Sequence, residues 1–202
     1  MRRDIYTRPA GKPMFVPVRR RDDFAPIEKA EPVEIVAVDR ATECHVTPPD
    51  VAARMVSYLG GVGDIQTLEP SAGTGNLSRA LIEAGQSRFE LTQVERHREL
   101  AAGLRRCGFG SVINRCFLEY AAEAAGKVEF AHIIMNPPFR EVRKHIAAAV
   151  SLLGRNGHDF APRLVALVPV TFEHEQAEEL ERLPVDTFQT AKVHTKIIRI
   201  EV

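Results

Sequence analysis

The sequence lacks long apolar runs, an excess of either charge, and a cysteine framework. No stretch approaches the ~18 consecutive apolar residues of a membrane-spanning helix, and no apolar segment follows the basic N-terminus, as a secretory signal would need. Lys and Arg number 27 together, and so do Asp and Glu. This balance excludes a histone-like coat for nucleic acid but leaves room for a local basic patch. We therefore expect a protein without a membrane partner.

Cysteine is equally scarce, with three residues and no CxxC spacing. An odd count without that spacing argues against a disulfide framework and against a zinc ribbon. The adjacent pair Cys44 and His45 has no second pair of ligands at metal spacing. These observations predict a reducing compartment, with the cytoplasm as the expected location, and no metal site.

Residues 1–40 differ in composition from the rest of the 202-residue chain. They contain spaced prolines, which block both a helix interior and a central strand. Residues 1–30 carry eight Lys and Arg against four Asp and Glu. We predict a basic, Pro-rich extended arm over residues 1–40, which is either a solvated tail or a segment that contacts phosphates. Residues 41–202 then form one folded domain.

From residue 41 onward, helical and strand patterns alternate, which predicts an α/β fold. We expect a Rossmann-like, doubly wound, mostly parallel sheet with an antiparallel C-terminal strand pair. Strands are expected at residues 65–68, 89–95, 112–113, 131–135, 164–170, 187–193 and 195–202. Helices are expected to start at residues 47 and 142 and to span residues 76–85, 97–107 and 173–182. Thr47 is the predicted N-cap of the first helix.

A glycine-rich turn joins the first strand of this domain to the next helix, with the sequence Glu69-Pro-Ser-Ala-Gly-Thr-Gly75. Gly73 and Gly75 let the backbone turn tightly and approach a ligand closely. The spacing matches neither the dinucleotide fingerprint nor the phosphate loop. Glu95 ends the next strand, 22 residues after Gly73, where an acidic side chain is placed to accept hydrogen bonds from ribose hydroxyls.

A second motif, Asn136-Pro137-Pro138-Phe139, follows the apolar strand at residues 131–135. Two consecutive prolines restrict the backbone and have no N–H groups of their own. We expect the Asn136 amide oxygen and the carbonyls of Asn136 and Pro137 to accept hydrogen bonds from an exocyclic amine. Phe139 offers a flat face on which a planar group can stack.

Taken together, these motifs resemble those of the class I S-adenosylmethionine-dependent methyltransferases. More narrowly, they resemble the amino-methylating branch typified by the DNA adenine-N6 methyltransferases. The Thr47-Pro48-Pro49 segment is similar to an additional cofactor motif of those DNA enzymes. The resemblance covers roughly residues 42–202.

The resemblance implies S-adenosyl-L-methionine as cofactor and an adenine flipped out of DNA as target. It implies a catalytic set of Asn136, Pro137, Pro138 and Phe139. The implied cofactor-binding set is Thr47, Glu69, Pro70, Ser71, Ala72, Gly73, Gly75, Asn76, Glu95, Cys116 and Phe117. Within it, Glu95 would bind the ribose and Phe117 would contact the cofactor adenine. Cys116 departs from the family, which usually has an acidic residue there.

Three functions remain open. The first is a DNA adenine-N6 methyltransferase. The second is a methyltransferase for an amine in RNA or for a protein glutamine amide, and the third is a catalytically silent binding subunit, which the intact motifs disfavour. The residues after Phe139 are expected to complete the sheet, so sequence specificity would come from loops, the N-terminal arm or a partner protein.

Lesser features near the second motif have two interpretations each. Arg140, Arg143 and Lys144 either meet phosphates that flank a flipped base or form a solvated helix face. Phe188 is either a second base-stacking aromatic residue or part of the core.

Overall fold

The computed structural model describes residues 6–7, 13–14, 46–188 and 193–202. Most of the predicted arm, together with Cys44 and His45, lies outside the described residues. The chain divides into two units, Met1–Pro32 and Val33–Val202. In the first unit, β1 (Tyr6–Thr7) and β2 (Pro13–Met14) pair antiparallel.

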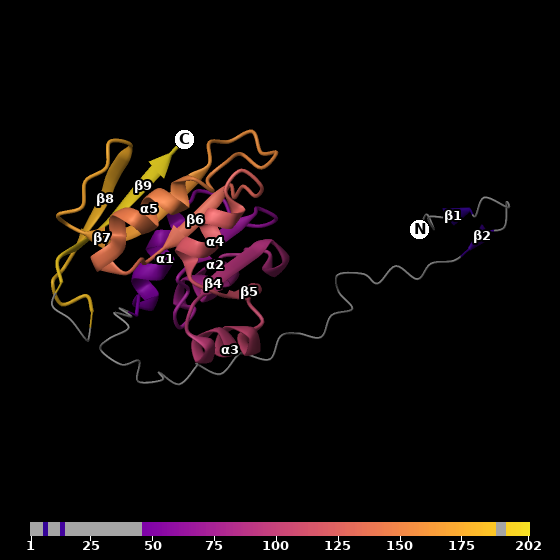
Figure 1. The fold of residues 1–202 in the computed structure, drawn as a ribbon, viewed down its shortest axis with the longest axis horizontal. Coiled ribbons are helices and arrows are strands. Elements are labelled where there is room, and N and C mark those ends of the chain that lie inside the picture. Colours follow the sequence, from indigo (N-terminus) through magenta and orange to yellow (C-terminus); the bar gives the residue numbers. More distant parts are fainter. Residues whose placement is uncertain (1–5, 8–12, 15–45, 189–192) are drawn as a thin grey trace. The chain divides into compact units, whose positions relative to one another are not determined.

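The second unit is built around a seven-stranded sheet in the order β5-β4-β3-β6-β7-β9-β8 (Figure 1). Its strands are β3 (Thr67–Pro70), β4 (Leu91–Glu95), β5 (Ser111–Asn114), β6 (His132–Met135), β7 (Arg163–Pro169), β8 (Ala177–Leu183) and β9 (Thr195–Glu201). The first five run parallel, and β9 is antiparallel to both of its neighbours. The predicted fold class is confirmed. The strand order reverses between β3 and β6, which is where sheets of this kind bind ligands.

Five α-helices flank the described part of the sheet. They are α1 (Pro49–Ser57), α2 (Asn76–Glu83), α3 (Arg98–Cys107), α4 (Phe117–Ala124) and α5 (Val142–Val150), with short 3₁₀ turns η3 (Arg88–Glu90) and η4 (Phe139–Glu141). α1 packs against α2, and α4 packs against α5. The core under α4 and α5 contains Leu68, Val94, Ile133 and Met135 from the central strands. None of the helices in the described ranges is both long and apolar enough to cross a membrane.

The start of the first helix differs from the prediction. α1 begins at Pro49 with Pro48 as its N-cap residue, and no side chain caps it. Thr47 instead uses its hydroxyl to accept a hydrogen bond from Asn136, 89 residues further along the chain. A tertiary contact has thus replaced the local cap. α4 was not predicted, because its alanine-rich sequence shows no clear apolar stripe.

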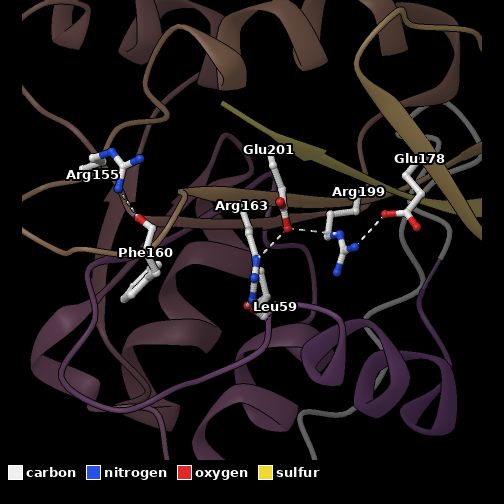
Figure 2. A network of polar contacts seen from close by, with 7 residues as sticks. All are labelled: Leu59, Arg155, Phe160, Arg163, Glu178, Arg199 and Glu201. Carbon is white, nitrogen blue, oxygen red and sulfur yellow. Dashed lines mark hydrogen bonds and ion pairs between the residues drawn. The ribbon is translucent and has the colours of Figure 1, made fainter.

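The predicted helix at residues 173–182 is wrong: β8 occupies most of this segment. Its glutamates favour a helix in isolation, but the neighbouring strand β9 supplies basic partners. Glu178 pairs with Arg199 at 2.6 Å, and Glu179 with Lys196 at 3.1 Å. Figure 2 shows the same network continuing from Arg199 to the Glu201 carboxylate, at 3.3 Å, and on to Arg163. Cross-strand charge pairs therefore offset the low strand propensity of glutamate.

The strand predicted at residues 187–193 is also corrected. Thr187 and Phe188 follow a turn in which the Thr187 N–H donates to the Pro184 carbonyl at 3.1 Å. Residues 189–192 lie outside the described part of the chain. The antiparallel C-terminal pair is therefore β8 with β9.

Candidate active site

A cavity of about 280 Å³ lies where β3, β4, β5 and β6 end. It occupies the position at which the strand order reverses. The predicted site residues that line it are Thr47, Glu69, Ser71, Ala72, Gly73, Asn76, Glu95, Cys116, Phe117, Asn136 and Pro138. Pro70, Gly75, Pro137 and Phe139 do not line it. The structure thus brings most of the predicted cofactor residues to one cavity.

The glycine-rich turn is shaped by left-handed backbone conformations. Ser71 has φ of 58° and Gly73 has φ of 55°. A non-glycine residue in this region costs about 1–2 kcal/mol, so Ser71 stores strain at the edge of the cavity. The Ala72 N–H donates to the Val94 carbonyl at 3.0 Å, which anchors the turn to β4.

Gly75 has a packing role that the motif did not reveal. It stands at the N-cap of α2 with φ of 80°. A β-carbon built there would lie 2.6 Å from the Cδ2 atom of Leu104, on α3. The missing side chain therefore leaves room for the Leu104 side chain, whereas Gly73 is the glycine that lines the cavity.

The Glu95 carboxylate is held in place by backbone N–H groups. One oxygen accepts from the Gly73 N–H at 2.8 Å, and the other accepts from the His97 N–H at 2.7 Å. The side chain is only 4% exposed, yet it lines the cavity. Each carboxylate oxygen has a second lone pair that can accept a hydrogen bond from a ligand hydroxyl. The acidic side chain therefore contacts the glycine-rich turn directly.

Glu69 stands in a different environment, at the end of the neighbouring strand. The Ser78 hydroxyl donates to its carboxyl group, and the Gln93 amide donates to the Ser78 hydroxyl at 2.5 Å. Burial raises the pKa of Glu69 to about 8, and the negative charge of Glu95 adds to this effect. Glu69 is therefore mostly protonated at neutral pH. Sequence reasoning missed Ser78 and Gln93, although a glutamine inside an apolar strand was a signal.

Thr47 joins the two predicted motifs. The Asn136 Nδ2 group donates to the Thr47 hydroxyl at 3.0 Å, and the Asn76 Nδ2 group donates to the Thr47 carbonyl at 2.8 Å. Thr47 is 5% exposed. Because Nδ2 of Asn136 points to Thr47, Oδ1 is the end of that amide that can accept from a bound group.

The remaining residues of the second motif lie in different surroundings. Pro137 is buried, and Pro138 lines the cavity. Phe139 begins η4 outside the cavity, with its ring 6.5 Å from that of Phe188 and inclined at 78°. This edge-to-face arrangement is a favourable aromatic geometry. Phe188, which is 4% exposed, therefore lies beside Phe139.

The far end of the cavity is formed by the start of α4 and by α5. Cys116 is the N-cap residue of α4 and is half-buried. Phe117 is buried, and its ring lies 5.9 Å from that of His145 on α5. His145 also lines the cavity. It was missed because residues 142–153 were interpreted only through their apolar stripe.

A scan against models of known protein families finds none that matches, and a search of curated proteins finds no match either. Solved structures do match. The 23S rRNA methyltransferase ErmE aligns with a TM-score of 0.62 and 17% identity over 78% of this chain and 69% of its own. The chain has a methyltransferase fold. A modification subunit of a putative type I restriction enzyme from Vibrio vulnificus YJ016 aligns with a TM-score of 0.63 and 16% identity, over 81% of this chain and 45% of its own.

A third similar structure contains the expected cofactor. Magnesium protoporphyrin IX methyltransferase from Synechocystis PCC 6803, solved with bound S-adenosylmethionine, aligns with a TM-score of 0.55 and 12% identity. The alignment covers 76% of this chain and 78% of that one. The three proteins share the fold but differ in function, so the substrate of this chain has to be argued from its own residues.

Proposed function

We propose that this chain is an S-adenosylmethionine-dependent methyltransferase that modifies the exocyclic N6 amine of an adenine flipped out of DNA. The observation that carries the proposal is the hydrogen bond between Asn136 and Thr47. It couples the predicted amine-binding motif to a wall of the predicted cofactor cavity. The two sites must adjoin if a methyl group is to pass from one ligand to the other.

The cavity has the donors and acceptors that suit this cofactor. Glu95 would accept from the ribose hydroxyls, and the backbone of the glycine-rich turn would hold the methionine portion. Phe117 would cover the adenine. When bound, S-adenosylmethionine supplies an electrophilic methyl group on its sulfonium.

The second motif would orient the target amine. Asn136 Oδ1 and the Pro137 carbonyl would accept its two hydrogens, which favours tetrahedral geometry and frees the nitrogen lone pair for in-line attack. The methylated amine would then lose its proton to water, so this scheme requires no dedicated base. Positioning of the two reacting groups and preorganised hydrogen-bond acceptors would account for the rate acceleration.

The aromatic pair beside the motif favours a planar target. Phe139 would stack on the flipped base, and Phe188 packs edge-on against Phe139 at 6.5 Å. Stacking of a base on an aromatic side chain contributes about 1–3 kcal/mol. The target must leave the duplex first, because its amine is otherwise paired.

The basic residues that follow the second motif already have partners within the chain. Lys144 pairs with Glu141 at 2.8 Å, and the Arg143 guanidinium lies 5.7 Å from the centre of the Phe172 ring. A phosphate would have to compete with these contacts. Specificity contacts are therefore expected to come mainly from other loops, the N-terminal arm or a partner protein.

An RNA amine is the second candidate, because the structurally similar proteins include an rRNA methyltransferase. A protein glutamine amide presents the same planar nitrogen. The test is incubation with methyl-labelled S-adenosylmethionine and, separately, unmethylated DNA, bulk RNA and ribosomal protein factors. Label recovered as N6-methyldeoxyadenosine supports the proposal. Label found only in RNA or protein overturns the DNA assignment, and failure to bind the cofactor overturns the proposed enzyme class.

A further inference from the structure

His145 is a buried residue of the cavity wall whose two ring nitrogens differ in their contacts. It lies on α5, is 5% exposed, and lines the cavity beside Phe117. Its Nδ1 atom is 3.1 Å from the backbone carbonyl oxygen of Glu141. Among the described residues no hydrogen bond to its Nε2 atom is found.

The carbonyl contact decides the tautomer of the ring. A carbonyl oxygen can only accept, so Nδ1 carries the hydrogen and donates it to Glu141. Burial lowers the pKa of His145, and the positive charges of Arg96 and Lys144 act in the same direction, against the carbonyl and the carboxylate of Glu141. The ring is therefore neutral at pH 7, and its Nε2 atom is a hydrogen-bond acceptor.

An acceptor at this place requires a donor on the ligand. The cofactor has three kinds of donor: the methionine ammonium, the ribose hydroxyls and the adenine amine. The glycine-rich turn and Glu95 stand at the ends of β3 and β4, and they suit the first two. His145 adjoins Phe117, at the start of α4 after β5, which is the expected adenine end.

We infer that His145 Nε2 accepts a hydrogen bond from the exocyclic amine of the cofactor's adenine. This inference rests on the proposed function, and it assigns His145 as a cofactor-binding and specificity-determining residue. It also accounts for the cysteine at position 116: the thiol is a weak acceptor, and the acceptor for the amine comes from α5 instead. An amine has two hydrogens, so Cys116 can still face the second.

The test compares two ligands, S-adenosylhomocysteine and its analogue with unsubstituted purine in place of adenine. The wild-type chain is expected to bind the adenine ligand about fivefold more tightly, the size of one neutral hydrogen bond. His145→Phe keeps a flat ring without the acceptor, and it should bind both ligands equally. Phe117→Leu is the matched control, because it should weaken both ligands and keep the preference. Calorimetric titration measures all of these.

The outcomes separate this inference from the proposed function. If wild type binds S-adenosylhomocysteine and His145→Phe keeps the fivefold preference, the inference is wrong and the proposed cofactor stands. If wild type binds neither ligand, the proposed function itself fails. A second measurement avoids the variant: the ¹⁵N shift of the wild-type His145 Nε2 should move with the adenine ligand and not with the purine analogue. Equal shifts with both ligands would overturn the inference.

Discussion

The cavity edge of the sheet and the β8–β9 hairpin surround their ionisable side chains in opposite ways. At the cavity, Glu95 is 4% exposed and is fixed by two backbone N–H groups, while Glu69 is 1% exposed and mostly protonated. On the hairpin, Glu178 pairs with Arg199, and the glutamate side chain is 59% exposed. Buried groups are costly to disturb, whereas exposed ion pairs contribute about 0–1 kcal/mol. Substitutions at the cavity should therefore have large, specific effects on activity or stability, whereas substitutions on the hairpin should have small effects.

The largest effect is expected at Asn136. Asn136→Ala removes one acceptor for the target amine, a loss of the kind that reduces rates by about 10²–10³-fold. The fold and most of the cofactor affinity should remain, because Asn136 is only half-buried. Methyl transfer under single-turnover conditions measures the loss, with cofactor titration as the control. Retention of more than a tenth of the wild-type rate would show that Asn136 does not bind the amine.

Glu69 should make stability depend on pH. Its folded pKa, about 8, lies above the ordinary value of 4.5. The contribution of Glu69 to the free energy of unfolding is therefore fully present below pH 4.5, and it is lost as the pH rises from 4.5 to 8. Each pH unit within the window costs at most about 1.4 kcal/mol. We expect a loss of about 2 kcal/mol between pH 6 and pH 8 from this group, measured by urea unfolding.

Glu69→Gln supplies the control for this effect, because an amide imitates the protonated carboxyl group without titrating. As the pH rises from 6 to 8, the unfolding free energy of the wild type should therefore fall relative to that of Glu69→Gln. A difference that is constant from pH 6 to pH 8 would contradict the raised pKa.

The aromatic ring of Phe139 should contribute to substrate binding. Phe139→Ala is expected to weaken substrate use by the stacking energy of about 1–3 kcal/mol, whereas Phe139→Tyr should largely preserve it. The ratio kcat/KM on a nucleic-acid substrate measures both, with cofactor affinity unchanged. Equal damage from tyrosine and alanine would identify Phe139 as a packing residue and not a stacking platform.

The smallest effect is expected on the hairpin. Glu178→Gln breaks the exposed ion pair with Arg199 and should lower stability by less than about 1 kcal/mol, with a smaller effect at high salt. Methyl transfer should be unchanged. A loss comparable to that expected from a buried charge would show that the two regions do not differ as described.

The same contrast explains what the sequence could predict. Gly73 and the paired prolines Pro137 and Pro138 restrict the backbone by themselves, so their turns can be recognised from local sequence. The contact between Gly73 and Glu95 was predictable because parallel strands end at one edge. β8 was predicted as a helix because its strand conformation depends on pairing with β9, and local propensity does not include the effect of that pairing. Thr47 was mistaken for a cap because its true partner, Asn136, is 89 residues away.

His145 and Gly75 illustrate two other limits. The chemistry of His145 depends on which helix face meets the cavity, and the packing role of Gly75 depends on Leu104 of another helix. Both facts follow from packing between elements, which the order of residues does not reveal.

The position of the transferred methyl group tests the proposed amine methylation most directly. Nucleosides from nucleic acid treated with the wild-type chain and S-adenosylmethionine should be compared with authentic methylated standards by mass spectrometry, with Asn136→Ala in parallel. We expect methyl on the exocyclic N6 nitrogen of adenine from the wild type and at least a hundredfold less from the variant. Methyl on a ring carbon or ring nitrogen, or equal product from both proteins, would contradict it.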